Sequence, residues 1–219
     1  DTYSLLVEGA VGSTETATYG FNLIPIIPPA VIPGDVLPTP TTTWTGVAGG
    51  NWNIAANWSS GVVPTAADNV YIGLPAGQTV FISNGTVTVN SLVCDADLTL
   101  SGNASLTLNG ASRVNGKLTI TGGTLGGTGN VTVTGAFDVT GTYSSLSGTG
   151  VFTTQGLSTI KSNRVDLAGG KTWLNEGTLT VVGDSYIRFG VASGVTTTLT
   201  NAAGATINLA GTNLTPLFF

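Results

Sequence analysis

The chain lacks histidine and methionine altogether, and among its 219 residues it has one cysteine and only six lysines and arginines. Histidine is the commonest general base and metal ligand, so its absence removes the Ser-His and Cys-His nucleophile pairs. The single Cys94 can form no intramolecular disulfide, and no cysteine cluster exists for zinc or iron–sulfur binding. We therefore expect no catalytic residue, no cofactor and no metal site, and we interpret Cys94 as an inert buried thiol.

Charge is also scarce: 8% of the residues are charged, against about a quarter in an ordinary soluble domain. Six cations in a chain of net charge −5 are too few to follow a phosphate backbone, so nucleic acid is not an expected partner.

No apolar run reaches the roughly 18 to 20 residues of a membrane-spanning helix. The longest, from Phe21 to Leu37, is broken by four prolines.

Turn-forming and β-branched residues fill the chain instead, with 32 glycines, 37 threonines and 16 asparagines. From Trp44 onward, short apolar–polar–apolar triplets such as Leu98–Leu100, Leu118–Ile120 and Val131–Val133 alternate with Gly and Asn turns. In a strand, the first and third side chains of such a triplet share one face and the middle one lies on the other. The pattern predicts an all-β fold of unusually short strands.

The spacing of the triplets favours a coil of strands. Leu98 and Leu118 are 20 residues apart, and the segment from Asn175 to Thr180 reappears in looser form about 27 residues later, from Asn201. Periods of roughly 20 to 30 residues are typical of solenoids. We predict a right-handed parallel β-helix; the alternative, an antiparallel sandwich, would usually have longer strands joined by two-residue turns.

Three segments are expected along the chain. Alternating apolar residues predict a β-hairpin over residues 1–23. Residues 24–43 hold six of the nine prolines and are interpreted as an extended Pro/Thr-rich linker. The β-helix would occupy residues 44–219, with an N-terminal cap at 44–78. Because the chain begins at Asp1 without a methionine or a signal peptide, we expect a fragment or processed product of something longer.

Three of the four tryptophans, Trp44, Trp52 and Trp58, fall within fifteen residues. One interpretation is a cap that covers the open apolar end of the first turn. The other is a glycan site in which Trp52 or Trp58 stacks on a sugar ring. The cap interpretation is favoured, because large aromatic side chains are usually mostly buried. We expect Trp173, which stands alone, to lie in the core or to fill a corner.

Acidic residues were considered as catalytic pairs because glycan-cleaving enzymes often use two carboxyl groups. Asp95 and Asp97 would lie on the same side of an extended segment. Asp138 and Asp166 are the middle residues of triplets and should face outward, and a lyase or hydrolase would need such acids gathered with Lys161 or Arg164. No spacing brings them together, so we interpret them as surface charges.

Threonine pairs suggest a further alternative. Thr-x-Thr sequences at Thr86, Thr119 and Thr132 could form a regular hydroxyl array of the kind seen in ice-binding solenoids. The glycine run from Gly122 to Gly129 contains no aspartate, which argues against a calcium-binding repeat.

The segment Trp44-Thr45-Gly46, Gly50-Asn51-Trp52, Asn57-Trp58, Pro64 and Asp68-Asn69-Val70-Tyr71-Ile72 resembles the entry module of bacterial surface β-helix proteins. The later Asn-x-Gly-Thr-Leu-Thr-Val sequence pattern is similar to that of autotransporter-type and filamentous-haemagglutinin-type adhesins. The first 23 residues resemble the last strands of a pre-peptidase-type extracellular β domain. The resemblance implies a secreted or cell-surface protein whose usual role is adhesion.

We therefore expect a non-enzymatic structural or adhesive segment of a large exported protein, a rigid rod that contacts other protein or cell surfaces or copies of itself. Glycan binding through Trp52 and Trp58 is the main alternative, and a polysaccharide lyase, a hydrolase or an ice-binding solenoid is a weaker one. The apolar end, from Leu214 to Phe219, is expected to cover the last turn or to insert into a neighbouring chain.

Overall fold

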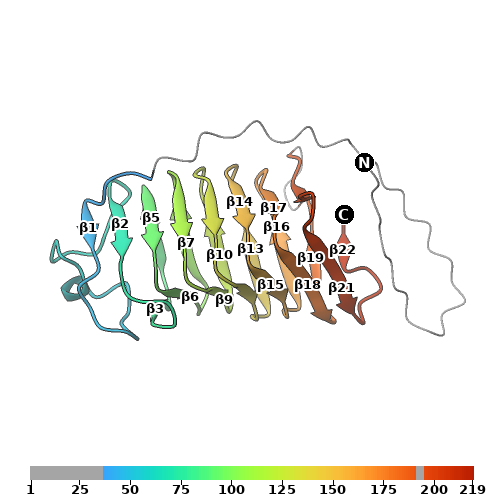
Figure 1. The fold of residues 1–219 in the computed structure, drawn as a ribbon, viewed down its shortest axis with the longest axis horizontal. Coiled ribbons are helices and arrows are strands. Elements are labelled where there is room, and N and C mark those ends of the chain that lie inside the picture. Colours follow the sequence, from blue (N-terminus) through green and yellow to red (C-terminus); the bar gives the residue numbers. More distant parts are fainter. Residues whose placement is uncertain (1–36, 191–194) are drawn as a thin grey trace, which may run out of the picture. The chain divides into compact units, whose positions relative to one another are not determined.

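A computed structural model describes residues 37–190 and 195–219, and these residues form an all-β solenoid (Figure 1). The expected hairpin over 1–23 and most of the expected linker lie outside the described residues. The only helical element of the described part is one short 3-10 turn, η1 (Ala55–Asn57). No helix in that part is long and apolar enough to span a bilayer.

The strands form three sheets of eight, seven and seven strands, which we number by their order along each coil. Sheet 1 contains β1 (Thr42–Thr43), β2 (Asn69–Ile72), β5 (Ser91–Cys94), β8 (Ser112–Val114), β11 (Val131–Val133), β14 (Val151–Thr154), β17 (Thr172–Asn175) and β20 (Thr198–Asn201). Sheet 2 contains β3 (Thr79–Ile82), β6 (Asp97–Leu100), β9 (Leu118–Ile120), β12 (Phe137–Val139), β15 (Leu157–Ile160), β18 (Thr178–Gly183) and β21 (Thr206–Gly211). Sheet 3 contains β4 (Thr86–Val89), β7 (Ala104–Leu108), β10 (Gly123–Gly126), β13 (Tyr143–Leu146), β16 (Arg164–Leu167), β19 (Tyr186–Arg188) and β22 (Leu217–Phe218).

From β2 onward each sheet takes every third strand of the chain, and all the pairings between these strands are parallel. The chain therefore winds through about six turns from β2 to β20. At about 4.8 Å between paired strands, these turns extend for roughly 30 Å. Asn175 pairs with Asn201, and Thr178 pairs with Thr206, as the repeat in the sequence predicts. The parallel β-helix is thus confirmed and the antiparallel sandwich is wrong.

The first rung begins within the expected linker. Thr42 and Thr43 form β1 and pair with Val70 and Tyr71 of β2. Thr42 is buried, and its hydroxyl contacts the hydroxyls of Ser59 and Ser60. The solenoid therefore starts two residues before the expected boundary at Trp44.

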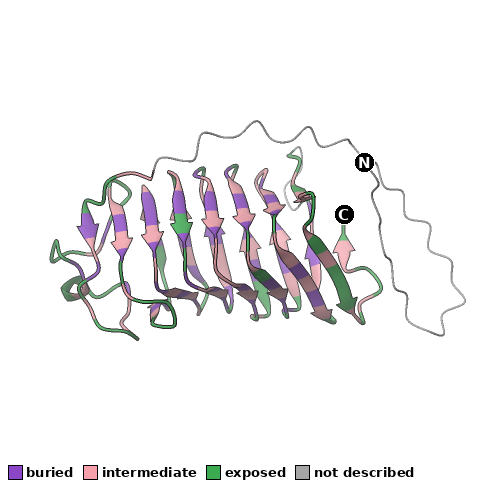
Figure 2. Cartoon of the chain, viewed as in Figure 1, coloured by how far each residue is buried: buried purple, intermediate pink, exposed green. Residues whose placement is uncertain are grey.

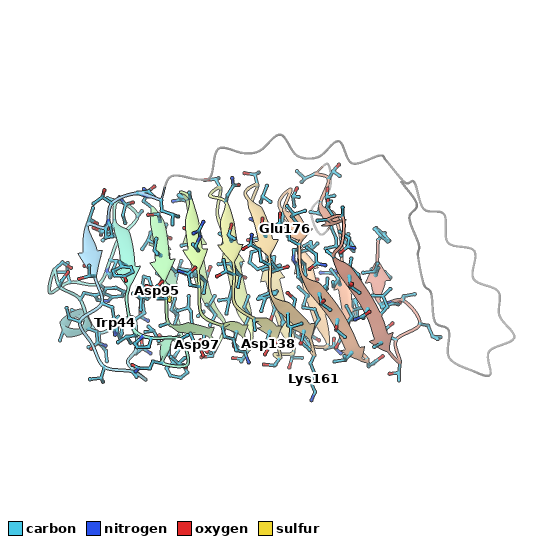
Figure 3. All side chains as sticks on the ribbon, viewed as in Figure 1. Trp44, Asp95, Asp97, Asp138, Lys161 and Glu176 are labelled. Carbon is cyan, nitrogen blue, oxygen red and sulfur yellow. The ribbon has the colours of Figure 1, made fainter. Side chains whose placement is uncertain are left out.

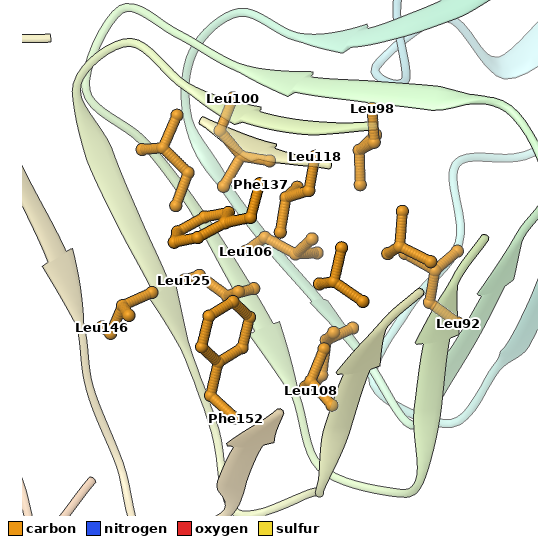
Figure 4. Close-up of a cluster of buried hydrophobic side chains, with 14 of the residues drawn as sticks. Leu92, Leu98, Leu100, Leu106, Leu108, Leu118, Leu125, Phe137, Leu146 and Phe152 are labelled. Atoms are coloured by element: carbon orange, nitrogen blue, oxygen red, sulfur yellow. The ribbon is translucent and has the colours of Figure 1, made fainter. Parts of the chain in front are cut away.

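Buried and less buried residues alternate along the strands (Figure 2), and the inward side chains form ladders that run from coil to coil. In sheet 2, Leu100, Ile120 and Val139 occupy the same register position on successive strands. Phe137, Phe152 and Trp173 form an edge-to-face aromatic cluster in the interior, with ring centroids 4.9 to 5.8 Å apart. Figure 4 shows Leu100, Phe137, Phe152 and other apolar side chains converging from different sheets on one continuous core. Trp173 is fully buried, as expected.

One corner of the coil is closed by a column of stacked glycines, including Gly135, Gly156 and Gly177. A Cβ atom on Gly156 would lie 2.4 Å from the carbonyl oxygen of Gly135 in the coil before it. Such a distance is far below van der Waals contact, so the tight stacking of coils at this corner requires glycine.

The N-terminal end of the solenoid is covered by Trp44, Trp52 and Trp58, which pack edge to face with centroid distances of 4.9 and 4.7 Å. Trp58 Nε1 donates a hydrogen bond of 2.8 Å to the carbonyl oxygen of Trp52. The indole nitrogens of Trp44 and Trp52 have no partner among the described residues. All three side chains belong to the same hydrophobic cluster as the interior ladders.

The last coil is more exposed than the others. Leu209, at a core-facing position of β21, is 40% exposed, and β21 is drawn mostly green in Figure 2. The apolar end of the chain completes this coil: β22 pairs with β19, and Phe219 stacks on Phe189 with ring centroids 4.7 Å apart. No charged residue occurs between Phe189 and Phe219.

Replacing Trp58 with alanine should destabilise the solenoid by about 3–5 kcal/mol, since it removes a buried ring and the hydrogen bond to Trp52. Urea unfolding followed by far-ultraviolet circular dichroism measures this loss. Val62→Ala, at an exposed position near the same cap, should change stability by no more than about 0.5 kcal/mol. Equal unfolding midpoints for the native chain and Trp58→Ala would contradict the cap.

Candidate functional site

The two tryptophans considered for glycan stacking have no accessible ring face. Trp52 is fully buried and Trp58 is 2% exposed. A sugar ring could reach either indole only after the cap opened. These two side chains therefore pack within the cap.

Asp95 and Asp97 flank the buried Ala96 and lie on the same side of the chain, as the alternation predicts. Each is engaged locally: Asp95 accepts hydrogen bonds from Tyr71 Oη at 2.8 Å and from Asn115 Nδ2 at 2.6 Å. Asp97 accepts from the backbone N–H groups of Gly77 and Lys117. Because they tie neighbouring coils together, these carboxylates serve the corners of the solenoid (Figure 3).

The remaining candidate charges are distributed over different faces. Asp138 lies outward on β12 in sheet 2 and forms an ion pair with Lys117, while Asp166 lies on β16 in sheet 3. Lys161 projects away from the ribbon in Figure 3, and Arg164 is the neighbour of Asp166. Within residues 37–190 and 195–219, no three acidic, cysteine or histidine residues cluster as metal ligands would.

The Thr-x-Thr pairs do not form one array. Thr86 and Thr88 lie on β4, Thr119 on β9 and Thr132 on β11, which belong to three different sheets. The glycine run that begins at Gly122 contains a strand, β10, rather than a ligand loop.

Exposed aromatic side chains gather on the later coils of sheet 3. Those exposed in the described part of the chain are Tyr143 at 58%, Phe218 at 48% and Phe219 at 86%. Tyr143 and Phe218 lie on β13 and β22, and Phe219 follows β22 directly. This grouping contrasts with the buried rings of the cap and of the core.

Two outward columns of sheet 3 run across these coils. Tyr143, Arg164 and Tyr186 are register partners on β13, β16 and β19. The neighbouring column begins with Thr86, Ser105, Thr124 and Ser145, and its later members are no longer hydroxyl-bearing. Its last three members are Asp166, Arg188 and Phe218. We call six side chains of these columns the aromatic–arginine strip: Tyr143, Arg164, Asp166, Tyr186, Arg188 and Phe218.

Close contacts hold the strip together. Arg188 forms a two-pronged ion pair with Asp166, from Nε to Oδ1 at 2.9 Å and from Nη2 to Oδ2 at 2.8 Å. The Arg164 guanidinium lies 4.8 Å from the centre of the Tyr143 ring. Its Nε is 3.0 Å from Asp166 Oδ1, without the alignment of a hydrogen bond. The hydrogen bond to Asp166 raises the pKa of Arg188 above its ordinary value, so its positive charge is fixed.

Next to the strip, an open hollow of about 360 Å³ is lined by Tyr186, Arg188, Asn213, Thr215 and Phe218. The Tyr186 and Phe218 rings meet edge to face, with centroids 6.3 Å apart. The lining therefore combines two aromatic rings, one cation and two hydrogen-bonding side chains. Such a combination can hold a polar ring-shaped ligand.

Sequence inspection picked out Arg164 and Asp166 but missed Tyr143, Tyr186, Arg188 and Phe218 as members of one surface. A signal was present, because Tyr143, Arg164 and Tyr186 are separated by 21 and 22 residues, close to the length of one coil. The spacing becomes informative only when the register of sheet 3 is known.

Among the described residues, Cys94 and Lys171 are titratable groups that lie in the interior. Burial raises the pKa of the Cys94 thiol to about 12, in agreement with an inert cysteine. Lys171 is buried, and its Nζ donates a hydrogen bond of 2.9 Å to the carbonyl oxygen of Gly150. Burial lowers the pKa of Lys171 to about 8.

Comparisons with known proteins leave the function open: no protein-family model, no curated protein sequence and no solved structure matches this chain. A β-solenoid occurs in enzymes and in structural proteins alike, so the fold alone does not assign a role.

The pKa of Lys171 makes a pH-dependent prediction. Between about pH 8 and 10.5 the unfolded chain keeps a proton on this lysine that the folded chain has lost, so stability rises with pH. The unfolding free energy should increase by about 1 kcal/mol from pH 8 to pH 9. Above about pH 9, Cys94 acts in the opposite direction, because its thiol ionises first in the unfolded chain.

Urea titrations at several pH values measure the effect. Lys171→Met should remove the rise and stabilise the chain at pH 7, while Lys161→Met, at an exposed lysine, should retain the rise. If the native chain and Lys171→Met show parallel pH profiles, the buried amine is not the source.

Proposed function

We propose that this chain is a non-enzymatic structural and adhesive segment of a larger secreted or cell-surface protein. The observation that carries the proposal is the gathering of exposed aromatic and arginine side chains on one end of sheet 3. A ladder of parallel coils makes a stiff support, and the strip gives that support a surface for contact.

Several features support this role. The interior is filled by continuous apolar ladders from the cap to the last coil, so the turns are held in a fixed register. A stiff framework reduces the ordering cost of binding, because side chains placed on strands are already oriented. The carboxylates considered for catalysis are each occupied in local hydrogen bonds or ion pairs.

The low charge and the resemblance to bacterial surface β-helix proteins support the extracellular location and the adhesin class, both of which belong to the proposal. Self-association is a further part of it: among the described residues β20, β21 and β22 each pair on one side only, and this coil has no charge to repel a second copy.

Adhesion of chain-coated beads under flow tests the proposal. The surfaces would carry a sialylated mucin, an acidic polysaccharide, collagen or the chain itself, and retention is expected on at least one of them. Replacing Tyr143, Tyr186 and Phe218 with serine should release most beads from that surface, because the exposed rings supply the contact.

A matched control replaces three exposed apolar residues of the N-terminal cap region, Val47, Ile54 and Val62, with serine. This control should adhere like the native chain. No retention on any of the four surfaces, or equal retention of the strip variant, would contradict the adhesive role.

A further inference from the structure

The strip repeats at the spacing of the solenoid. Successive members of each column lie on paired parallel strands, so they are about 4.8 Å apart along the axis. This rise is close to the length of one residue in an extended polysaccharide. An extended polypeptide presents side chains on one face every two residues, at about 6.6–6.8 Å, which does not match.

The position of the strip also favours a saccharide over a peptide. The strip lies on the face of sheet 3, where the backbone groups are already paired between strands. A peptide that adds to a sheet needs an unpaired edge for its own main-chain groups. A sugar needs only ring faces and hydrogen-bonding side chains, which Tyr186, Phe218, Asn213 and Thr215 provide around the hollow.

Charge selects the kind of saccharide. The strip holds two guanidinium groups and one carboxylate, for a local charge of +1 on a chain of net charge −5. Two of the chain's six cations therefore lie on this one surface. No acidic residue lines the hollow. An anionic group on the ligand would complete the charge balance.

Arg188 is oriented to receive that anion. Asp166 occupies its Nε and Nη2 groups, and the described residues offer no hydrogen-bond partner to Nη1. The side chain is about 30% exposed, so its outer N–H groups can reach a ligand in the hollow. A carboxylate suits a guanidinium because charge-assisted hydrogen bonds between them are short and strong.

We propose that the aromatic–arginine strip binds a uronate-containing polysaccharide along the solenoid axis, with a sugar carboxylate at Arg188 and a sugar ring against Tyr186 and Phe218. This inference rests on the adhesive role proposed above and names its ligand class. The volume of the hollow, about 360 Å³, lies at the small end of the range for ligand sites and fits a short stretch of sugar.

Isothermal titration calorimetry with a galacturonate hexasaccharide tests the inference, and the fully methyl-esterified hexasaccharide serves as the neutral ligand. The acid form should bind and the ester should bind at least tenfold more weakly. Raising the salt to about 0.5 M should weaken binding of the acid form, since partly exposed charges are screened.

Arg188→Gln should weaken binding of the acid form roughly tenfold or more, as expected for the loss of a charge-assisted hydrogen bond. Phe218→Ser leaves the ion pair between Asp166 and Arg188 intact and should also weaken binding of the acid form several-fold. The matched control is Arg113→Gln, which removes the same charge from an exposed position of β8 in sheet 1 and should bind like the native chain. Thermal unfolding confirms that each variant is folded.

Any of three results would overturn the uronate assignment. The acid and the ester bind equally, Arg188→Gln and Arg113→Gln lose the same affinity, or a sulfated oligosaccharide of the same length binds more tightly. If the hexasaccharide does not bind but bead adhesion still depends on the strip, only the assigned ligand class is overturned. If bead adhesion is also absent, both proposals fail.

Discussion

Parallel hydrogen bonding between successive coils is the interaction on which this structure depends. Each central strand pairs with the strands one coil before and one coil after it, so inward side chains stack into ladders and outward side chains into columns. Residues of the central strands therefore have register partners about 20 positions away in sequence. The glycine column and the tryptophan cap are consequences, because close stacking needs corners without Cβ atoms and an end protected from solvent.

Because of the same stacking, outward residues that are about one coil apart in the sequence lie side by side on one surface. The outward column of sheet 3 that contains Ser105, Thr124 and Ser145 is hydroxyl-bearing in its first part and carries no charge there. Where the column changes to Asp166, Arg188 and Phe218, it gains charge and ring faces on a rigid support. The proposed binding depends on these departures from the repeat, whereas the buried aromatic clusters pack in the core.

The sequence predicted the strands whose inward residues are apolar and missed those whose inward residues are small or polar. Leu98–Leu100 and Leu118–Ile120 are strands as predicted, because alternation is explicit there. Strands β8, β13 and β15 place Ser112, Ser144 and Ser158 inward, so the alternation is hidden. The strip could not be predicted because its residues meet only after the register of sheet 3 is fixed.

The parallel register is tested most directly by nuclear Overhauser contacts between backbone protons of a central strand and its neighbours. Thr132 of β11 should show contacts to Arg113 of β8 and Thr153 of β14, which are 19 and 21 residues away. Contacts from Thr132 to antiparallel partners on the adjacent segments of the chain, with none to Arg113 or Thr153, would contradict the solenoid and every column derived from it.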